Sequence, residues 1–118
     1  TRDPELWPMR GKTGAVRMAL EANVPLIPVA SWGAQLILPR YSKRISLFPR
    51  KNVVVKYGDP VDLSAYRGRN LDAAGFAAAT TMLMNDLTAL VEDLRGEVAP
   101  AQRWDPNQHD QRETGRFE

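Results

Sequence analysis

The longest regular pattern in this sequence runs over residues 71–95 and predicts a helix. Its larger apolar side chains recur at helical spacing, and Gly96 follows as a C-terminal stop. These apolar residues are Met82, Leu83, Leu87, Leu90, Val91 and Leu94. We interpret this segment as a helix that covers the core of the domain and carries no chemistry.

Residues 13–21 predict a second, shorter helix. Three apolar positions follow an i, i+3, i+4 spacing and two neighbours widen the stripe: Val16, Ala19 and Leu20, then Ala15 and Met18. Asn23 offers a stop to this helix. Residues 1–10 precede it as a loop with two prolines and an exposed Trp7.

Two apolar runs predict strands. Residues 25–30 suit a buried strand that Gly33 ends, with Pro28 implying an irregularity or an edge in the ladder. Residues 52–57 predict the next strand, and the turn-forming residues 58–60 close it. A helix followed by a buried strand indicates an α/β layer.

Composition narrows the class of protein. The chain has 118 residues, 43% of them hydrophobic, which is typical of one ordinary globular domain or part of one. Because cysteine is absent, disulfides, thiolate zinc sites and cysteine nucleophiles are excluded. The longest apolar stretches, residues 24–30 and 53–55, are strand-sized, so we expect any membrane contact to be peripheral.

Charge is distributed unevenly along the chain. Residues 10–56 carry nine basic residues against one acid, Glu21, whereas residues from 57 onward carry six basic residues against eleven acids. The basic half therefore predicts an anionic partner, which charge alone leaves open among phosphorylated small molecules, anionic lipid headgroups and nucleic acid. Within it, residues 40–51 form a loop of cations interleaved with apolar side chains.

Residues 10–14, Arg-Gly-Lys-Thr-Gly, suggest phosphate binding, because amides at a helix start and a lysine attract phosphate. The Walker signature fails, since Leu6 stands where it needs a glycine and no apolar strand precedes the loop. Nucleotide hydrolysis is therefore not indicated. Another kind of phosphate binding stays open, beside the alternative of solvated cations near a helix start.

The chain contains no complete catalytic constellation. His109 is its one histidine, lies in the polar residues 97–118, and is followed five positions later by Thr114 rather than an acid. The serines lack a glycine elbow, and no metal-ligand spacing appears. We predict no catalytic residue and no metal site within these residues.

Two blocks nevertheless resemble the 1-acylglycerol-3-phosphate (lysophosphatidic acid) acyltransferase family. Residues 12–15, Lys-Thr-Gly-Ala, lead into the short helix, and residues 22–30 read Ala-Asn-Val-Pro-Leu-Ile-Pro-Val-Ala before Gly33. The family has a Lys-x-Gly-Ala helix followed by a Val-Pro-Ile-Pro-Val-like block, both downstream of a Glu-Gly-Thr motif. Residues 57–62, Tyr-Gly-Asp-Pro-Val-Asp, are similar to its Gly-x-Pro strand exit, and the resemblance extends to about residue 66.

The resemblance implies a fold in the α/β class, a partial αβα acyltransferase domain with a mixed sheet. It assigns residues 1–66 to the C-terminal part of that domain, and residues 67–96, the amphipathic helix, fit the family by type only. The low hydrophobicity of residues 97–118 predicts a disordered tail or one that is loosely docked. The implied activity is transfer of an acyl group from acyl-CoA or acyl carrier protein to a lysophospholipid, giving phosphatidate. The catalytic histidine would come from a His-x-x-x-x-Asp motif upstream, so we expect these residues alone to be inactive and poorly stable.

The resemblance also implies the substrate site, with no cofactor beyond the acyl thioester co-substrate. Its expected members are Lys12 as a phosphate contact, Arg10 and Arg2 as weaker ones, Gly14 for close packing, and Pro25 and Pro28 shaping the strand beside the acyl site. For the prolines, a purely structural role is the alternative.

We expect residues 40–51, with nearby Trp32, to suit peripheral docking on the anionic cytoplasmic face of a membrane. A solvated loop is the alternative. Two rival interpretations remain: a non-catalytic basic module that binds anionic lipid or RNA, which the acyltransferase-like order of the blocks makes less favourable, and an inactive paralogue that serves as a structural subunit.

Overall fold

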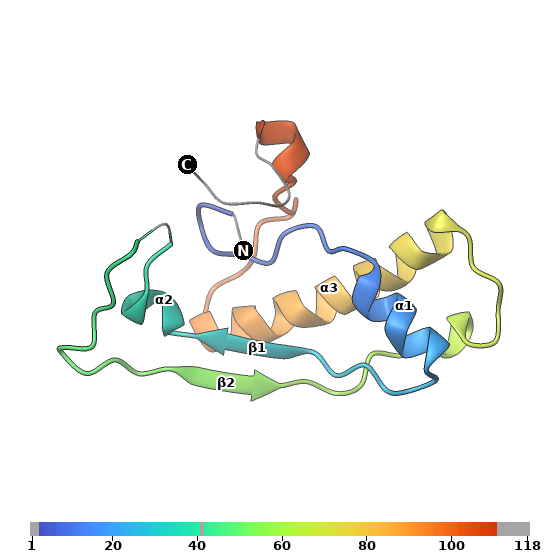
Figure 1. Ribbon diagram of the computed structural model, residues 1–118, viewed down its shortest axis with the longest axis horizontal. Helices are drawn as coiled ribbons and strands as arrows, with labels where there is room; N and C mark the ends of the chain where they lie inside the picture. Colours follow the sequence, from blue (N-terminus) through green and yellow to red (C-terminus); the bar gives the residue numbers. More distant parts are fainter. Residues whose placement is uncertain (1–2, 41, 111–118) are drawn as a thin grey trace.

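The computed structural model describes residues 3–40 and 42–110. Its elements in chain order are α1 (Gly14–Glu21), β1 (Val29–Trp32), α2 (Ala34–Ile37), β2 (Val54–Tyr57), the 3-10 turn η1 (Ser64–Tyr66), α3 (Ala73–Arg95) and the 3-10 turn η2 (Pro106–His109). The long helix α3 lies against both strands and against α1 (Figure 1). The chain is therefore a mixed α/β fold built around one helix.

The predicted long helix is confirmed with nearly the predicted bounds. Asp72 caps its start, because the carboxylate Oδ1 accepts a hydrogen bond of 2.8 Å from the amide of Gly75. Gly96 ends it in the left-handed conformation with φ of 65°, which glycine adopts without steric cost. By length and composition alone α3 could also cross a membrane, although core helices of soluble proteins pass the same test.

The predicted short helix is confirmed as α1, but its buried face is narrower than expected. Val16 and Ala19 are buried and Leu20 is half-buried, whereas Ala15 is exposed and Met18 is 71% exposed. Only the side of α1 that faces α3 is covered, so the flanking positions point to solvent.

The two strands form an antiparallel pair rather than the expected mixed sheet. Ala30 pairs with Lys56 and Trp32 with Val54, and within the described residues the sheet has these two strands only. The strand β1 begins only at Val29, after the prolines. Before it, the two chain segments stay paired in an irregular way: the carbonyl oxygens of Pro28 and Leu26 accept hydrogen bonds from the amides of Gly58 and Val61. Pro28 thus causes the irregularity that the sequence predicts.

Gly33 ends β1 as predicted, and the structure gives the reason. Its φ is 104°, and a Cβ there would collide with the carbonyl oxygen of Asn52 on the neighbouring chain segment. The chain reverses at this position into the single turn α2. A residue with a side chain would push the two segments apart.

The core lies between α1, α3 and the segment that follows β2. Its buried members are Val16, Ala19, Val61, Leu63, Ala79 and Leu83. The sheet is covered by α3 on one face only, because Val29, Val55 and Tyr57 on the other face are 45%, 51% and 71% exposed. The buried strand that the sequence predicts is therefore only half-buried in this structure.

Both ends of the described chain dock on α3, which the sequence predicted only as one of two alternatives for the C-terminal end. Trp7 is 5% exposed rather than exposed. Residues 97–110 are ordered and lie alongside the N-terminal segment. The carbonyl oxygen of Trp104 accepts a 3.2 Å hydrogen bond from the amide of Arg10, and Pro106 is buried. Residues 111–118 of the expected tail lie outside the described residues.

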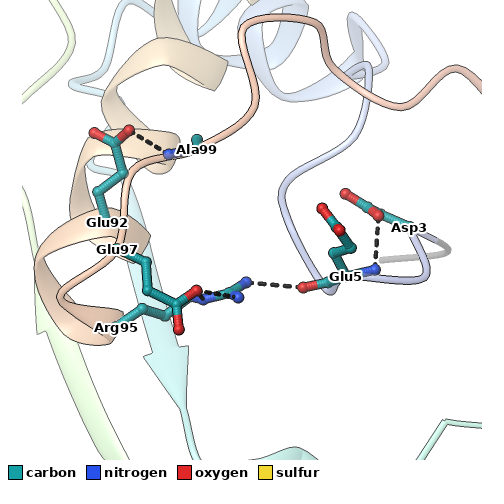
Figure 2. A network of polar contacts seen from close by, with 6 residues as sticks. All are labelled: Asp3, Glu5, Glu92, Arg95, Glu97 and Ala99. Atoms are coloured by element: carbon teal, nitrogen blue, oxygen red, sulfur yellow. Dashed lines mark hydrogen bonds and ion pairs between the residues drawn. The ribbon is translucent and has the colours of Figure 1, made fainter.

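Arg95 holds these ends together at the C-terminus of α3 (Figure 2). Its Nη1 donates to the carbonyl oxygen of Glu5 at 2.8 Å, and its Nη2 lies 2.6 Å from Oε2 of Glu97. The guanidinium also lies over the rings of Trp7 and Trp32, at 3.8 and 4.5 Å from their centroids. One side chain therefore links the N-terminal segment, β1, α3 and the C-terminal segment.

Candidate functional site

A cavity of about 630 Å³ opens where the start of α1 meets the middle of α3. It is lined by residues 10–13, by Thr80 and Met84 of α3, and by Arg103 and Asp105 of the C-terminal segment. The cavity thus brings together three segments that are far apart in the sequence.

Gly11 brings the first wall close to α3. A Cβ at this position would lie 2.7 Å from both Cγ and Sδ of Met84 and 3.0 Å from Cγ2 of Thr80. Gly14, which the resemblance assigned to close packing, is exposed, and a Cβ there would meet nothing within 4 Å. Close packing in the Arg-Gly-Lys-Thr-Gly segment is therefore a property of Gly11, and that part of the prediction is wrong for Gly14.

Basic side chains dominate the cavity. Among its described lining residues, Arg10, Lys12 and Arg103 are cations and Asp105 is the one carboxylate. Nε of Arg10 lies 3.9 Å from Oδ1 of Asp105, with side chains 58% and 19% exposed, so this pair is long and largely solvated. The cavity therefore keeps an excess of positive charge that suits an anionic ligand.

Arg103 is the member of this site that sequence reasoning missed. Its Nη2 donates to Oδ1 of Asn85 on α3 at 2.6 Å, while its buried Nε has no hydrogen-bond partner among the described residues. A single arginine in a polar, low-hydrophobicity segment carries no signal of its own. Only the folded position of residues 97–110 identifies it.

The structure brings together two of the predicted substrate residues and places the two prolines elsewhere. Arg10 and Lys12 both line the cavity, whereas Pro25 and Pro28 do not. Pro25 is exposed and Pro28 is buried beside Gly58, so both lie in the connection to the sheet. Arg2 lies outside the described residues.

His109 has a structural setting. Its ring stacks on Trp104 with centroids 3.6 Å apart and an interplanar angle of 7°. Within residues 3–40 and 42–110, no group of three or more His, Asp or Glu side chains could hold a metal ion. The chemistry that these residues support is binding of an anion by cations.

The loop of residues 42–51 exposes apolar side chains among its cations. Phe48, Ile45 and Leu47 are 89%, 66% and 62% exposed, and Lys43 and Arg44 beside them are exposed as well. Trp32, which we expected to join this surface, instead stacks on Arg95. The loop is thus a second basic surface, without the tryptophan.

Comparison of the chain with models of protein families, with curated proteins and with solved structures finds no match. The comparisons therefore assign no family.

Proposed function

We propose that this chain is the C-terminal part of an acyltransferase that acts on 1-acylglycerol-3-phosphate and gives phosphatidate. In this reaction the free hydroxyl of the acceptor attacks the acyl thioester of acyl-CoA or acyl carrier protein. An ester C–O bond forms, the C–S bond breaks and the thiol leaves with a proton. The observation that carries the proposal is the cavity that holds Arg10 and Lys12 at the start of α1.

The cavity suits the phosphate of a lysophospholipid. A phosphomonoester carries a charge of roughly −1.5 to −2 at neutral pH and offers several acceptor oxygens. Lysine and arginine side chains give charge-assisted hydrogen bonds to such a group, and the start of α1 adds the positive end of a helix dipole. The Lys-Thr-Gly-Ala block of the resemblance therefore coincides with a site of the right charge.

These 118 residues supply binding and not the base. No His-x-x-x-x-Asp motif occurs in the sequence, and His109 stacks on Trp104. Deprotonation of the acceptor hydroxyl would need a histidine and an aspartate from outside these residues. The chain alone is then inactive, and a longer protein that contains both groups is active.

The second basic surface supports a peripheral location on the cytoplasmic face of a membrane. Each cation near an anionic bilayer contributes about 1 kcal/mol, and exposed apolar side chains such as Phe48 and Leu47 add burial in the interface. A membrane position would also present the lysophospholipid acceptor to the cavity. Flotation with vesicles of anionic lipid tests this part of the proposal.

The decisive experiment measures acyl transfer to lysophosphatidate by this chain and by the product of the reading frame extended upstream. We expect transfer only from the longer product, and only if it contains a His-x-x-x-x-Asp motif. In that product Lys12→Ala should raise KM for lysophosphatidate about tenfold, which corresponds to about 1.4 kcal/mol. Arg69→Ala, which changes an exposed cation outside the cavity, is the matched control.

Transfer by the 118 residues alone would contradict the proposal, as would a longer product without activity. In the second case the alternative is a non-catalytic basic module that binds anionic lipid or RNA through residues 42–51. The mixture of cations and exposed Phe48 favours that module. Vesicle flotation and RNA retention at the same salt concentration separate its two ligands.

A further inference from the structure

We propose that Arg103 is a third phosphate-binding side chain of the cavity, so that residues 97–110 form a wall of the substrate site. This inference rests on the proposed function, because it takes the phosphate of lysophosphatidate as the ligand. Neither the sequence blocks nor their resemblance includes Arg103.

Arg103 is carried by a segment that the fold holds in place. The next residue, Trp104, accepts a hydrogen bond from the amide of Arg10, and Pro106 is buried. Asp105 caps η2 by accepting a 3.0 Å hydrogen bond from the amide of Asn107. The arginine is therefore placed at the cavity by its neighbours on both the N-terminal and C-terminal segments.

The guanidinium of Arg103 has hydrogen-bonding capacity left for a ligand. Its 2.6 Å bond from Nη2 to Oδ1 of Asn85 fixes one edge, and Nε is buried with no partner among the described residues. A buried donor left unsatisfied destabilises the fold, and more so when it belongs to a charged group. Because Nε itself is buried, an anionic ligand in the cavity that Arg103 lines would accept hydrogen bonds from the remaining N–H groups of the guanidinium.

The chemistry of the group points to phosphate. Arginine presents its N–H donors in a rigid planar fork that matches two oxygens of a phosphate, whereas lysine acts as a point charge. Lys12 and Arg10 line the same cavity from the segment at the start of α1. A phosphomonoester in the cavity would meet cations from both the N-terminal and the C-terminal segment.

This arrangement makes the C-terminal segment part of the ligand's binding free energy. A ligand that contacts Arg103 stabilises the docked state of residues 97–110 by an amount that grows with the logarithm of the ligand concentration above its Kd. Loss of Arg103 should therefore weaken binding of the phosphate group without altering α1 or the Lys12 wall. A purely structural Arg103 would not discriminate between ligands with and without phosphate.

The test measures binding of short-chain lysophosphatidate and of the matching monoacylglycerol, which lacks the phosphate, to the complete protein. We expect Arg103→Ala to weaken lysophosphatidate binding about tenfold, or about 1.4 kcal/mol, and to leave monoacylglycerol binding unchanged. Arg103→Lys should recover part of the loss, because it restores the charge but not the fork. Arg69→Ala again serves as the control, and thermal unfolding verifies that each variant is folded.

The outcomes separate the two proposals. If Lys12→Ala weakens lysophosphatidate binding and folded Arg103→Ala or Arg103→Lys does not, Arg103 is structural and only this inference fails. If the wild-type protein binds lysophosphatidate no better than monoacylglycerol, the phosphate site itself is absent and the proposed function fails with it. If Arg103→Ala weakens both ligands equally, the residue supports the fold of the site and the inference is again wrong.

Discussion

Arg95 and Arg103 both join α3 to the ends of the chain, yet they differ in how their donors are used. The side chain of Arg95 is 10% exposed, donates to Glu5 and Glu97, and has a tryptophan ring on two sides. Arg103 has Asn85 as a partner and a buried Nε without one among the described residues. An arginine whose donors are satisfied stabilises the fold, whereas an arginine that lines a cavity and keeps an unsatisfied donor is a candidate for ligand binding.

Trp7→Ala should cause the largest loss in the free energy of unfolding, because it removes the buried ring under Arg95. Replacing a buried tryptophan by alanine costs about 3–5 kcal/mol, and Trp7 is 5% exposed. The free energy of unfolding from urea denaturation measures the loss. Trp7→Phe, which keeps an aromatic ring, should lose clearly less, and equal losses for both variants would argue against stacking on Arg95.

Arg95→Ala should come next, with a loss of about 2–3 kcal/mol in the free energy of unfolding. It breaks charge-assisted hydrogen bonds to Glu5 and Glu97 and two cation–π contacts. Arg95→Lys should recover only a minor part, because lysine lacks the planar fork. A double-mutant cycle with Trp7→Ala should give a coupling energy above about 0.5 kcal/mol, and additivity would disprove direct contact.

Arg103→Ala should lower stability by less than about 1 kcal/mol in the absence of ligand, because removing the unsatisfied Nε offsets the lost bond to Asn85. With saturating lysophosphatidate the wild-type protein should gain melting temperature and the variant should gain less. Thermal scans with and without ligand measure both quantities. A loss as large as that of Arg95→Ala would end the distinction between the two arginines.

Local patterns were enough to predict α1, α3 and the order of the two strands, but not the single turn α2. The apolar spacing and Gly96 predicted α3, and Val16 and Ala19 predicted the buried face of α1. These signals are local because each depends on residues within one or two helical turns. Gly33 is similar, since its left-handed conformation belongs to the turn itself.

Long-range contacts account for what the sequence did not reveal. The ring of Trp7 is covered by the side chain of Arg95, which lies 88 positions later in the chain. The amide of Arg10 binds Trp104, so a segment with few apolar residues is held by the other end of the chain instead of by its own core. Lys12 and Arg10 of the site could be predicted from adjacent glycines, whereas Arg103 joins them only through this docking.

The smallest expected effect concerns Asp62, an exposed carboxylate satisfied within its own turn. Hydrogen bonds from the Ser64 side chain and then from its backbone amide lower the pKa of Asp62 below its ordinary value. A lowered pKa means that the carboxylate stabilises the fold above about pH 4 and that this contribution disappears as the pH falls through the lowered pKa. The stability difference between the wild type and Asp62→Asn should therefore shrink in acid.

Titration of the Asp62 carboxyl carbon by NMR gives the direct measurement, with Ser64→Ala as the matched variant. Loss of the Ser64 hydroxyl should move the midpoint upward, because the largest cause of the shift is removed while the backbone hydrogen bond remains. A midpoint that does not change would mean that the side-chain bond is not formed in solution. An exposed group such as Asp62 can exchange its partner for water at little cost. That result would mean that hydrogen bonds predict stability for largely buried side chains such as Arg95, but not for exposed ones.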